Sequence, residues 1–303
     1  MKNIINFFYN FNVIEIYSIN NGYYFNYNND SYVFMCCMRD LNEINAIYNL
    51  YKELKIRNVF VNDLILNKNG QIVCIVDNKT FVLIKDNTKN NRINMNDLLY
   101  IQNNTVNIKC DKKIFRNNWI KMWEIKIDYY EKNINGSLKK YPLLNKFIDY
   151  YIGLGENAIS YLSYNSVKKT NYVLSHKRIN INNSTFDFYN PLNFIIDSRV
   201  RDFSEYVKTQ FFYGTLSFDE FKRFVDYMNF SREECILLIS RLLFPTYFFD
   251  LYDSILNEEF PEENIKNVLD KKDEYANFLK NTFYYFINIK KINIPCIDWL
   301  IKY

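Results

Sequence analysis

The stretch Leu174-Ser175-His176-Lys177-Arg178 decides the fold, and it holds the only histidine of this 303-residue chain. Two short apolar runs, Val173-Leu174 overlapping its start and Phe194-Ile195-Ile196 after it, predict a pair of small strands inside a helical region. A Ser-His-Asp hydrolase, a Cys-His protease or a histidine-based metal site would have to use His176, because the chain has no other histidine. The sequence contains no G-x-S-x-G, G-x-x-x-x-G-K-[ST] or G-x-G-x-x-G motif, so any phosphate-binding loop must be minimal.

Upstream of this stretch, roughly the first 85 residues predict a twisted antiparallel sheet that carries one helix. Short apolar runs alternate there with clusters of Asn, Asp and Gly, which is typical of β-hairpins. The predicted strands are residues 23–25, 32–36, 59–61, 64–66, 72–76 and 81–84. Apolar residues at helical spacing predict the helix over residues 41–55, with Asp40 as its N-cap.

Downstream, apolar residues recur at helical spacing and predict a larger helical region. The predicted helices are residues 119–134, 143–162, 202–212, 246–256, 261–269 and 271–289. Ser217 and Ser231 each precede a glutamate by three residues, and this capping-box spacing predicts two further helix starts. The polar stretch 85–96 is the predicted linker. The expected fold class is therefore α+β, with a small antiparallel β-rich lobe over residues 1–88 and a mainly α-helical lobe over residues 89–303.

The composition predicts a soluble globular protein and limits its partners. The 38 basic and 34 acidic residues give a net charge of +4 and are interspersed, whereas nucleic-acid-binding proteins usually carry a clustered basic stripe. We therefore expect no nucleic-acid partner. No run of about 18 apolar residues predicts a membrane span, and the N-terminal segment lacks a signal-peptide cleavage site. The six cysteines form no CxxC pair, which is typical of a reducing, cytoplasmic compartment.

Three regions of the chain carry a family resemblance. They are Gly153-Leu154-Gly155-Glu156-Asn157-Ala158-Ile159, the segment from the His176 loop through Arg201-Asp202-Phe203-Ser204-Glu205-Tyr206, and Arg241-Leu242-Leu243-Phe244-Pro245. Together they resemble the CotS/YutH-type spore-coat-associated proteins, a divergent branch of the aminoglycoside phosphotransferase and choline kinase superfamily. The resemblance runs from the first hairpins to Tyr252. It implies a two-lobed protein-kinase-like fold, deposition in the spore coat, and other coat or scaffold proteins as partners.

The resemblance implies ATP and Mg²⁺ as cofactors, and phosphoryl transfer in the superfamily needs four parts. The first is a strand lysine paired with a helix glutamate, and the corresponding positions here are Met35 and Glu43. Met35 cannot bind phosphate, so Glu43 is interpreted as a solvated residue on the helix face. The second is a His-x-Asp loop, in which His176 supports the loop and Arg178 occupies the aspartate position. An arginine cannot accept the proton of an acceptor hydroxyl, which is the strongest argument against catalysis.

The two remaining parts would bind magnesium. Asn183 lies at about the spacing of the magnesium-binding asparagine, but in a chain so rich in Asn we interpret the match as coincidence. Asp197 ends the second predicted strand, where either a metal-binding aspartate or a strand-end turn residue would stand. Asp202 matches the helix-opening aspartate and is predicted to be an N-cap. Gly22 corresponds either to the turn over the nucleotide or to an ordinary hairpin turn.

Three functions stay open on this reading. The lost lysine and aspartate favour a catalytically degenerate, pseudokinase-like protein with a structural or interaction role. The alternative is an active small-molecule phosphotransferase with a rewired ATP and magnesium site, in which Asp187 or Asp197 is the base. A nucleic-acid-binding module is the least favoured. Arg178 is also predicted to pair with Asp197, as an Arg–Asp bridge at the former metal position.

Overall fold

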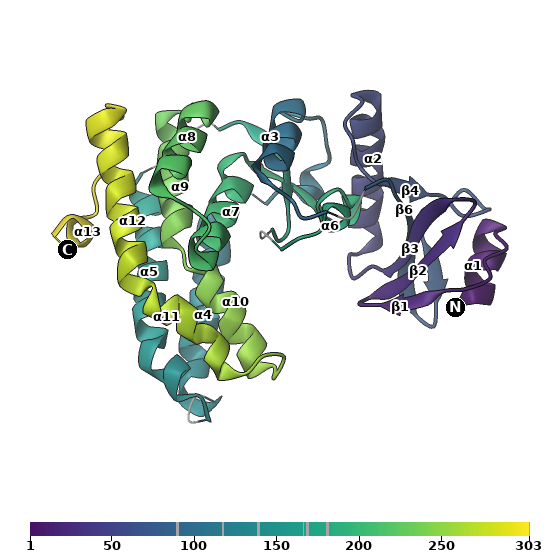
Figure 1. Ribbon diagram of the computed structural model, residues 1–303, viewed down its shortest axis with the longest axis horizontal. Coiled ribbons are helices and arrows are strands. Elements are labelled where there is room, and N and C mark those ends of the chain that lie inside the picture. Colours follow the sequence, from purple (N-terminus) through teal and green to yellow (C-terminus); the bar gives the residue numbers. More distant parts are fainter. Residues whose placement is uncertain are drawn as a thin grey trace. The chain divides into compact units, whose positions relative to one another are not determined.

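The computed structural model describes residues 1–88, 91–116, 118–137, 140–165, 167, 170–179 and 182–302, and the chain divides into two units. The first unit combines Met1–Arg116 with Tyr172–Arg199, and the second combines Asn117–Asn171 with Val200–Tyr303. An antiparallel sheet dominates the first unit and helices make up the second (Figure 1), which confirms the α+β fold class. The predicted lobe boundary falls at residues 88 and 89, the second of which lies outside the described residues, and it stays a prediction.

The first unit is built around an antiparallel sheet, which has six strands in the described part of the chain. The strands are β1 (Tyr17–Ile19), β2 (Gly22–Tyr27), β3 (Asp30–Cys36), β4 (Asp63–Ile65), β5 (Cys74–Val76) and β6 (Lys79–Asp86). Their order is β1-β2-β3-β6-β4, with β5 beside β6. Phe25, Phe34 and Leu83 pack in one core with α1 (Lys2–Tyr9), and α2 (Leu41–Ile56) lies on the opposite face of the sheet (Figure 1).

Several predicted element bounds change in this unit. Asp40 caps α2 as predicted, because its side chain accepts the Glu43 amide at 2.9 Å. The predicted strand 59–61 lies outside the sheet. The polar stretch 85–96 is not simply a linker, because β6 extends through Asp86 and α3 (Met95–Asn104) begins inside it. Residues 89 and 90 of this stretch lie outside the described residues.

A second, two-stranded sheet fixes the loop after His176. β7 (Tyr172–His176) and β8 (Phe194–Ser198) pair antiparallel, which confirms the two small strands predicted from sequence. Between them lie α6 (Thr185–Phe188) and η3 (Pro191–Asn193), and η1 (Lys112–Ile114) packs against α2 and β8. Thr105, at the end of α3, accepts the Leu174 amide at 3.0 Å. The loop therefore belongs to the same unit as α2 and the larger sheet.

The second unit is helical, and stacked aromatic rings fill its core. Its helices are α4 (Trp119–Ser137), α5 (Pro142–Tyr164), α7 (Val200–Tyr213), α8 (Phe218–Met228), α9 (Arg232–Leu243), α10 (Thr246–Leu256), η4 (Glu262–Ile265), α11 (Lys266–Asp270), α12 (Lys272–Tyr284), the π-helix η5 (Tyr285–Ile289) and α13 (Asp298–Lys302). α5 packs on α4 and α9, and α9 packs on α7 and α12. Ring centroids lie 4.5 Å apart for Trp123 and Phe244, and 3.8 Å apart for Tyr151 and Phe248. Such pairs add to the stability that their buried area gives.

Helix starts in this unit follow the predicted signals with one difference. Ser231 forms the full capping box with Glu234, and the Ser217 hydroxyl accepts the Glu220 amide at 3.1 Å. α7 begins at Val200, so Asp202 lies in the first turn and is not the N-cap. A carboxylate in the first turn still interacts favourably with the positive end of the helix dipole.

The stretch Arg232–Leu256 is long enough to cross a membrane, and by composition it contains an 18-residue window that is apolar enough, with a mean hydropathy of 1.4. It is not an unbroken run of about 18 apolar residues, because Ser240, Arg241 and Asp250 interrupt it, so the expectation from sequence is not contradicted. In the fold it comprises α9 and α10, and 83% of the apolar window is buried. That burial is typical of a core helix.

Replacing either of two glycines of α5 by alanine should change the free energy of unfolding, but in opposite directions. A Cβ at Gly155 would lie 2.6 Å from Cδ1 of the buried Ile127, whereas a Cβ at Gly153 would meet nothing within 4 Å. We expect Gly155→Ala to lower the free energy of unfolding by about 1–2 kcal/mol through overpacking. Gly153→Ala should raise it by about 1 kcal/mol, because alanine is the better helix former. Urea unfolding followed by circular dichroism measures both, and shifts of the same sign would contradict this account.

Candidate functional site

His176, at the end of β7, is buried among aromatic rings, with a relative exposure of 2%. Its Nε2 donates to the Phe188 carbonyl, 2.8 Å away, since a carbonyl oxygen can only accept. The imidazole stacks on Phe188 at a centroid distance of 4.3 Å, and Phe194 meets it edge-on at 5.5 Å. These contacts join β7 to α6 and β8.

Met35 lies on β3, paired with Gly22 of β2 and Val82 of β6. Its Sδ accepts a weak hydrogen bond from Nδ2 of the buried Asn190 at 3.5 Å. Gly22 is the first residue of β2, and a Cβ there would lie 2.6 Å from the Phe34 carbonyl oxygen. The close approach of two strands therefore requires glycine at this position.

Glu43 is a paired residue, so its interpretation as a solvated helix-face glutamate is wrong. Its carboxylate forms an ion pair with Arg39, one helical turn earlier, at 3.5 Å, and another with Arg116. The Glu43 side chain is only 17% exposed. In the first turn of α2 the carboxylate also meets the positive end of the helix dipole.

Arg39 and Lys177 bind three successive backbone carbonyls. Arg39 Nε donates to the Leu192 carbonyl at 2.9 Å and Nη2 donates to the Phe194 carbonyl at 2.6 Å. Between these two, the Asn193 carbonyl accepts the Lys177 amide at 2.9 Å. The residue after His176 is thereby held beside Arg39. Burial lowers the pKa of the Lys177 ammonium, and the positive charge of Arg39 lowers it further.

Arg116 reaches Glu43 from the segment after η1. Its amide donates to the Ile196 carbonyl at 2.9 Å, and its Nη1 donates to the Lys113 and Phe115 carbonyls at 2.8 and 3.0 Å. These bonds fix the guanidinium, whose Nη2 contacts Glu43. The strand β8 and helix α2 are therefore connected through this arginine.

Asn183 and Asp187 lie in the segment between β7 and β8. The backbone carbonyl of the half-buried Asn183 accepts the Ile93 amide at 3.2 Å. Asp187 lies in the first turn of α6, where Ser184 Oγ donates to its carboxylate at 2.9 Å and accepts its amide at 3.1 Å. Ser184 therefore caps α6, and the Asp187 carboxylate accepts a hydrogen bond from this cap residue.

Asp197 and Arg178 differ in exposure. Asp197 lies on β8 opposite Val173, has a relative exposure of 0%, and accepts the Ser198 amide at 2.7 Å. Arg178 is exposed. The predicted bridge between the two residues stays a prediction, as does magnesium binding by Asp197 and Asn183. Among the described residues, no three His, Cys, Asp or Glu side chains lie together as metal ligands.

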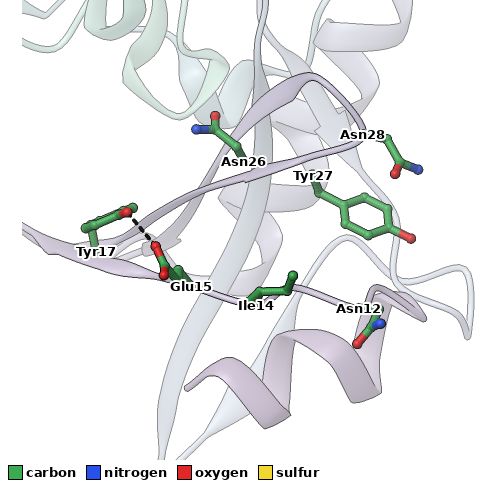
Figure 2. A pocket seen from close by; sticks show the side chains of 7 residues that line it. All are labelled: Asn12, Ile14, Glu15, Tyr17, Asn26, Tyr27 and Asn28. Atoms are coloured by element: carbon green, nitrogen blue, oxygen red, sulfur yellow. Dashed lines mark hydrogen bonds between the residues drawn. The ribbon is translucent and has the colours of Figure 1, made fainter.

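A hollow of about 630 Å³ lies elsewhere on the first unit (Figure 2). It is formed by the segment before β1 and the turn between β2 and β3, and its lining includes Ile14, Tyr17 and Tyr27. The Tyr17 hydroxyl donates to Glu15 at 2.8 Å at its rim. None of the residues that line it is a predicted site residue.

Sequence reasoning missed Arg39, Arg116 and Asn190 as members of the site. Arg39 precedes Glu43 by four residues, and this i,i+4 spacing could have indicated the ion pair. Arg116 is 73 residues from Glu43, so no local spacing connects them.

The fold is the one that solved kinase-like small-molecule phosphotransferases have. The chain is similar to an aminoglycoside phosphotransferase from Alicyclobacillus acidocaldarius subsp. acidocaldarius DSM 446, with a TM-score of 0.67 and 10% identity over 90% of this chain and 92% of that one. It is also similar to a spectinomycin phosphotransferase solved with ADP and spectinomycin, with a TM-score of 0.61 and 12% identity over 92% of each chain. At such identities the likeness shows the fold alone.

The chain belongs to the family described as spore coat putative kinase YutH, whose model matches residues 2–282. A curated relative, the endospore coat-associated protein YutH of Bacillus subtilis (strain 168), is 26% identical over 213 residues. The match covers 61% of this chain and spans 61% of that relative's length.

At three of the positions that the family resemblance assigns to a magnesium-bound nucleotide and its transfer, the residues present do not match the expected chemistry. The strand position that should carry a phosphate-binding cation carries the Met35 thioether, which contacts Asn190. The glutamate that should orient that cation is held by Arg39 and Arg116. A guanidinium, Arg178, stands where an aspartate should accept a proton.

Proposed function

We propose that this chain is a catalytically degenerate kinase-fold protein with a structural or interaction role in the spore coat. The observation that carries the proposal is the pairing of Glu43 with Arg39 and Arg116 beside a strand that offers Met35 in place of lysine. The glutamate keeps a fixed position without the lysine that would bind phosphate. It therefore has a structural use that needs no nucleotide.

The family and its relative support the coat role. The matching family and the relative from Bacillus subtilis are both described by their association with the spore coat. On this proposal the chain is made in the cytoplasm, is deposited in the coat, and binds other coat or scaffold proteins. Probing coat extracts of the sporulating source with an antibody against the chain tests this location. Absence of the chain from these extracts would contradict the coat role.

The second candidate is an active small-molecule phosphotransferase, which the likeness to solved phosphotransferases favours. Its base would be Asp187 or Asp197. The Asp187 carboxylate accepts a hydrogen bond from Ser184, and Asp197 is fully buried, so neither is poised to meet an acceptor hydroxyl in this conformation.

We expect no phosphoryl transfer from ATP to aminoglycosides or other small alcohols with Mg²⁺ or Mn²⁺. The assay follows labelled γ-phosphate in wild type, Asp197→Asn and Asp187→Asn, with a spectinomycin phosphotransferase as the positive control. All three should give the rate of the protein-free reaction. Metal-dependent transfer by wild type that falls about 100-fold or more in either variant would establish the second candidate instead.

A further inference from the structure

The hollow shown in Figure 2 opens where two stretches of the first unit part. The pairing of β1 with β2 begins at Tyr17, opposite Tyr24, and the segment before Tyr17 diverges from β2. The space between them measures about 630 Å³, within the range of about 300–1,000 Å³ that ligand pockets have. Three carboxamides, one carboxylate, two phenols and one aliphatic side chain line it. We propose that this hollow is a binding site for a neutral oligosaccharide.

The wall that precedes β1 is anchored to the core beneath it. Asn6 of α1 accepts the Val13 amide at 2.9 Å and donates to the Val13 carbonyl at 3.3 Å. Val13 is 2% exposed, whereas Asn12 and Ile14 on either side of it are exposed. The buried residue therefore fixes the backbone, and its two neighbours present their side chains to the hollow.

The opposite wall is the hairpin turn between β2 and β3. Asn28 and Asn29 have φ values of 50° and 65°, and two central residues with positive φ are typical of the tight type I′ turn. Just before the turn, the half-buried Tyr27 ring stacks on Phe11, with the ring centroids 4.5 Å and the planes 15° apart. The positions of the Asn28 carboxamide and the Tyr27 ring are therefore set by the turn and by the core.

Two further polar groups of the hollow are oriented by hydrogen bonds. Asn26 Oδ1 accepts from the Tyr24 and Ser31 hydroxyls, both at 2.9 Å, so the Asn26 Nδ2 group is left to donate. Glu15 accepts from the Tyr17 hydroxyl at 2.8 Å, and its carboxylate keeps further lone pairs that can accept. The site is thus largely organised before a ligand binds, which lowers the entropic cost of binding.

The lining favours a neutral ligand whose groups both donate and accept hydrogen bonds. Carboxamides and phenols do both, as sugar hydroxyls do. Among the described residues that line the hollow, Glu15 is the one charged side chain, so no cation is offered to phosphate or to another anion. Ile14 and Tyr17 are 80% and 54% exposed, and the C–H faces of pyranose rings can pack on such surfaces. A purely apolar ligand would leave the carboxamides without partners.

Saturation-transfer NMR of the full chain tests the site with three neutral trisaccharides: maltotriose, cellotriose and triacetylchitotriose. We expect at least one of them to bind with a dissociation constant of about 1 mM, because most of the lining residues are exposed to solvent. Asn28→Gly removes one carboxamide but tolerates the positive φ of the turn, so it should weaken this binding about fivefold. Asn29→Gly is the matched control, since Asn29 shares the turn but does not line the hollow, and it should change the affinity less than about twofold.

Glu15→Gln separates a saccharide from a basic peptide, which a carboxylate could also attract. The glutamine oxygen can still accept from Tyr17, so saccharide binding should fall less than about threefold. The peptide trilysine should not bind, and circular dichroism confirms that each variant is folded. No binding of any trisaccharide, or equal effects of Asn28→Gly and Asn29→Gly, would overturn the inference. Binding of trilysine alone, lost in Glu15→Gln, would assign the hollow to basic peptides instead. The site shares no residue with the loop after His176, so these outcomes leave the proposed function intact.

Discussion

Replacing Glu205 by alanine should lower the free energy of unfolding by about 3–5 kcal/mol, the usual cost of removing one partner from a buried ion pair. Glu205 lies on α7 and accepts from Lys208 Nζ at 2.8 Å, from Arg241 Nη2, and from the Thr246 hydroxyl at 2.6 Å. The side chains of Lys208 and Arg241 are 1% and 4% exposed. Without Glu205, the two buried cations lose the carboxylate that both of them contact.

Neither cation can easily turn towards water. Lys208 Nζ also donates to the Arg241 and Phe244 carbonyls at 2.9 and 3.2 Å, and the Arg241 guanidinium lies 4.6 Å from the Trp119 ring centre. Adding Lys208→Met to Glu205→Ala should therefore recover part of the loss, because one unpaired charge disappears.

Urea unfolding measures the free energy of each variant. The control is Glu156→Ala, an exposed glutamate of α5, which should change the free energy by less than about 0.5 kcal/mol. Equal effects of Glu205→Ala and Glu156→Ala would show that the buried network contributes nothing.

The same carboxylate predicts sensitivity to acid. Burial by itself would raise the pKa of Glu205, but the charges of Lys208 and Arg241 outweigh it and hold that pKa well below its usual value. A carboxyl whose folded-state pKa is depressed stabilises the fold fully above its unfolded pKa of about 4.3, and this contribution is lost as pH falls below that value. Wild-type stability should therefore fall more steeply with acid than that of Glu205→Gln, which has no carboxyl to protonate.

The sequence predicted best those elements whose apolar residues lie on a buried face. The run 194–196 became β8 because it is buried and pairs with β7, and the helical spacing over 41–55 became α2. The apolar run 59–61 did not become a strand. Asn62, which follows it, donates its amide to Tyr189 and its side chain to Phe186, so tertiary bonds fix this segment instead of a ladder.

Two of the helices that the sequence analysis missed, α1 and α3, were missed for different reasons. α1 carries asparagines that obscured its spacing, although Ile5 and Tyr9 lie four residues apart and are both buried in the core. α3 had a local signal, since Asn94 and Asp97 form a capping box that the sequence displays. A search for asparagine-led capping boxes would have found its start.

For the site, the sequence predicted which catalytic residues are missing but not which contacts replace them. The absence of lysine at Met35 and of aspartate at Arg178 is visible in the sequence, because each follows from one position in a matched motif. The pairing of Glu43 with Arg116 was not, because Arg116 comes from a segment 73 residues away. Such contacts are set by tertiary packing and leave no spacing to recognise.

Arg39→Ala should lower the free energy of unfolding by about 3 kcal/mol, because it leaves buried carbonyls without a donor and removes one counter-ion of Glu43. The carbonyls are those of Leu192, within η3, and of Phe194, the first residue of β8. Arg39 thus joins the start of α2 to β8, the strand that carries Asp197. In an active kinase a lysine on the neighbouring strand orients the same glutamate, and here Arg39 stabilises it without any nucleotide.

Arg57→Ala is the matched control, since Arg57 also pairs with a glutamate four residues away on α2, at 2.9 Å from Glu53. Its side chain is 34% exposed, and an exposed pair of this kind contributes only about 0.3–0.5 kcal/mol. The stability loss of Arg39→Lys should lie between those of Arg57→Ala and Arg39→Ala, because one ammonium cannot reproduce the two directed bonds of a guanidinium. Urea unfolding of the three variants compares them, and an Arg39→Ala loss no larger than that of Arg57→Ala would mean that α2 and β8 are held together without Arg39.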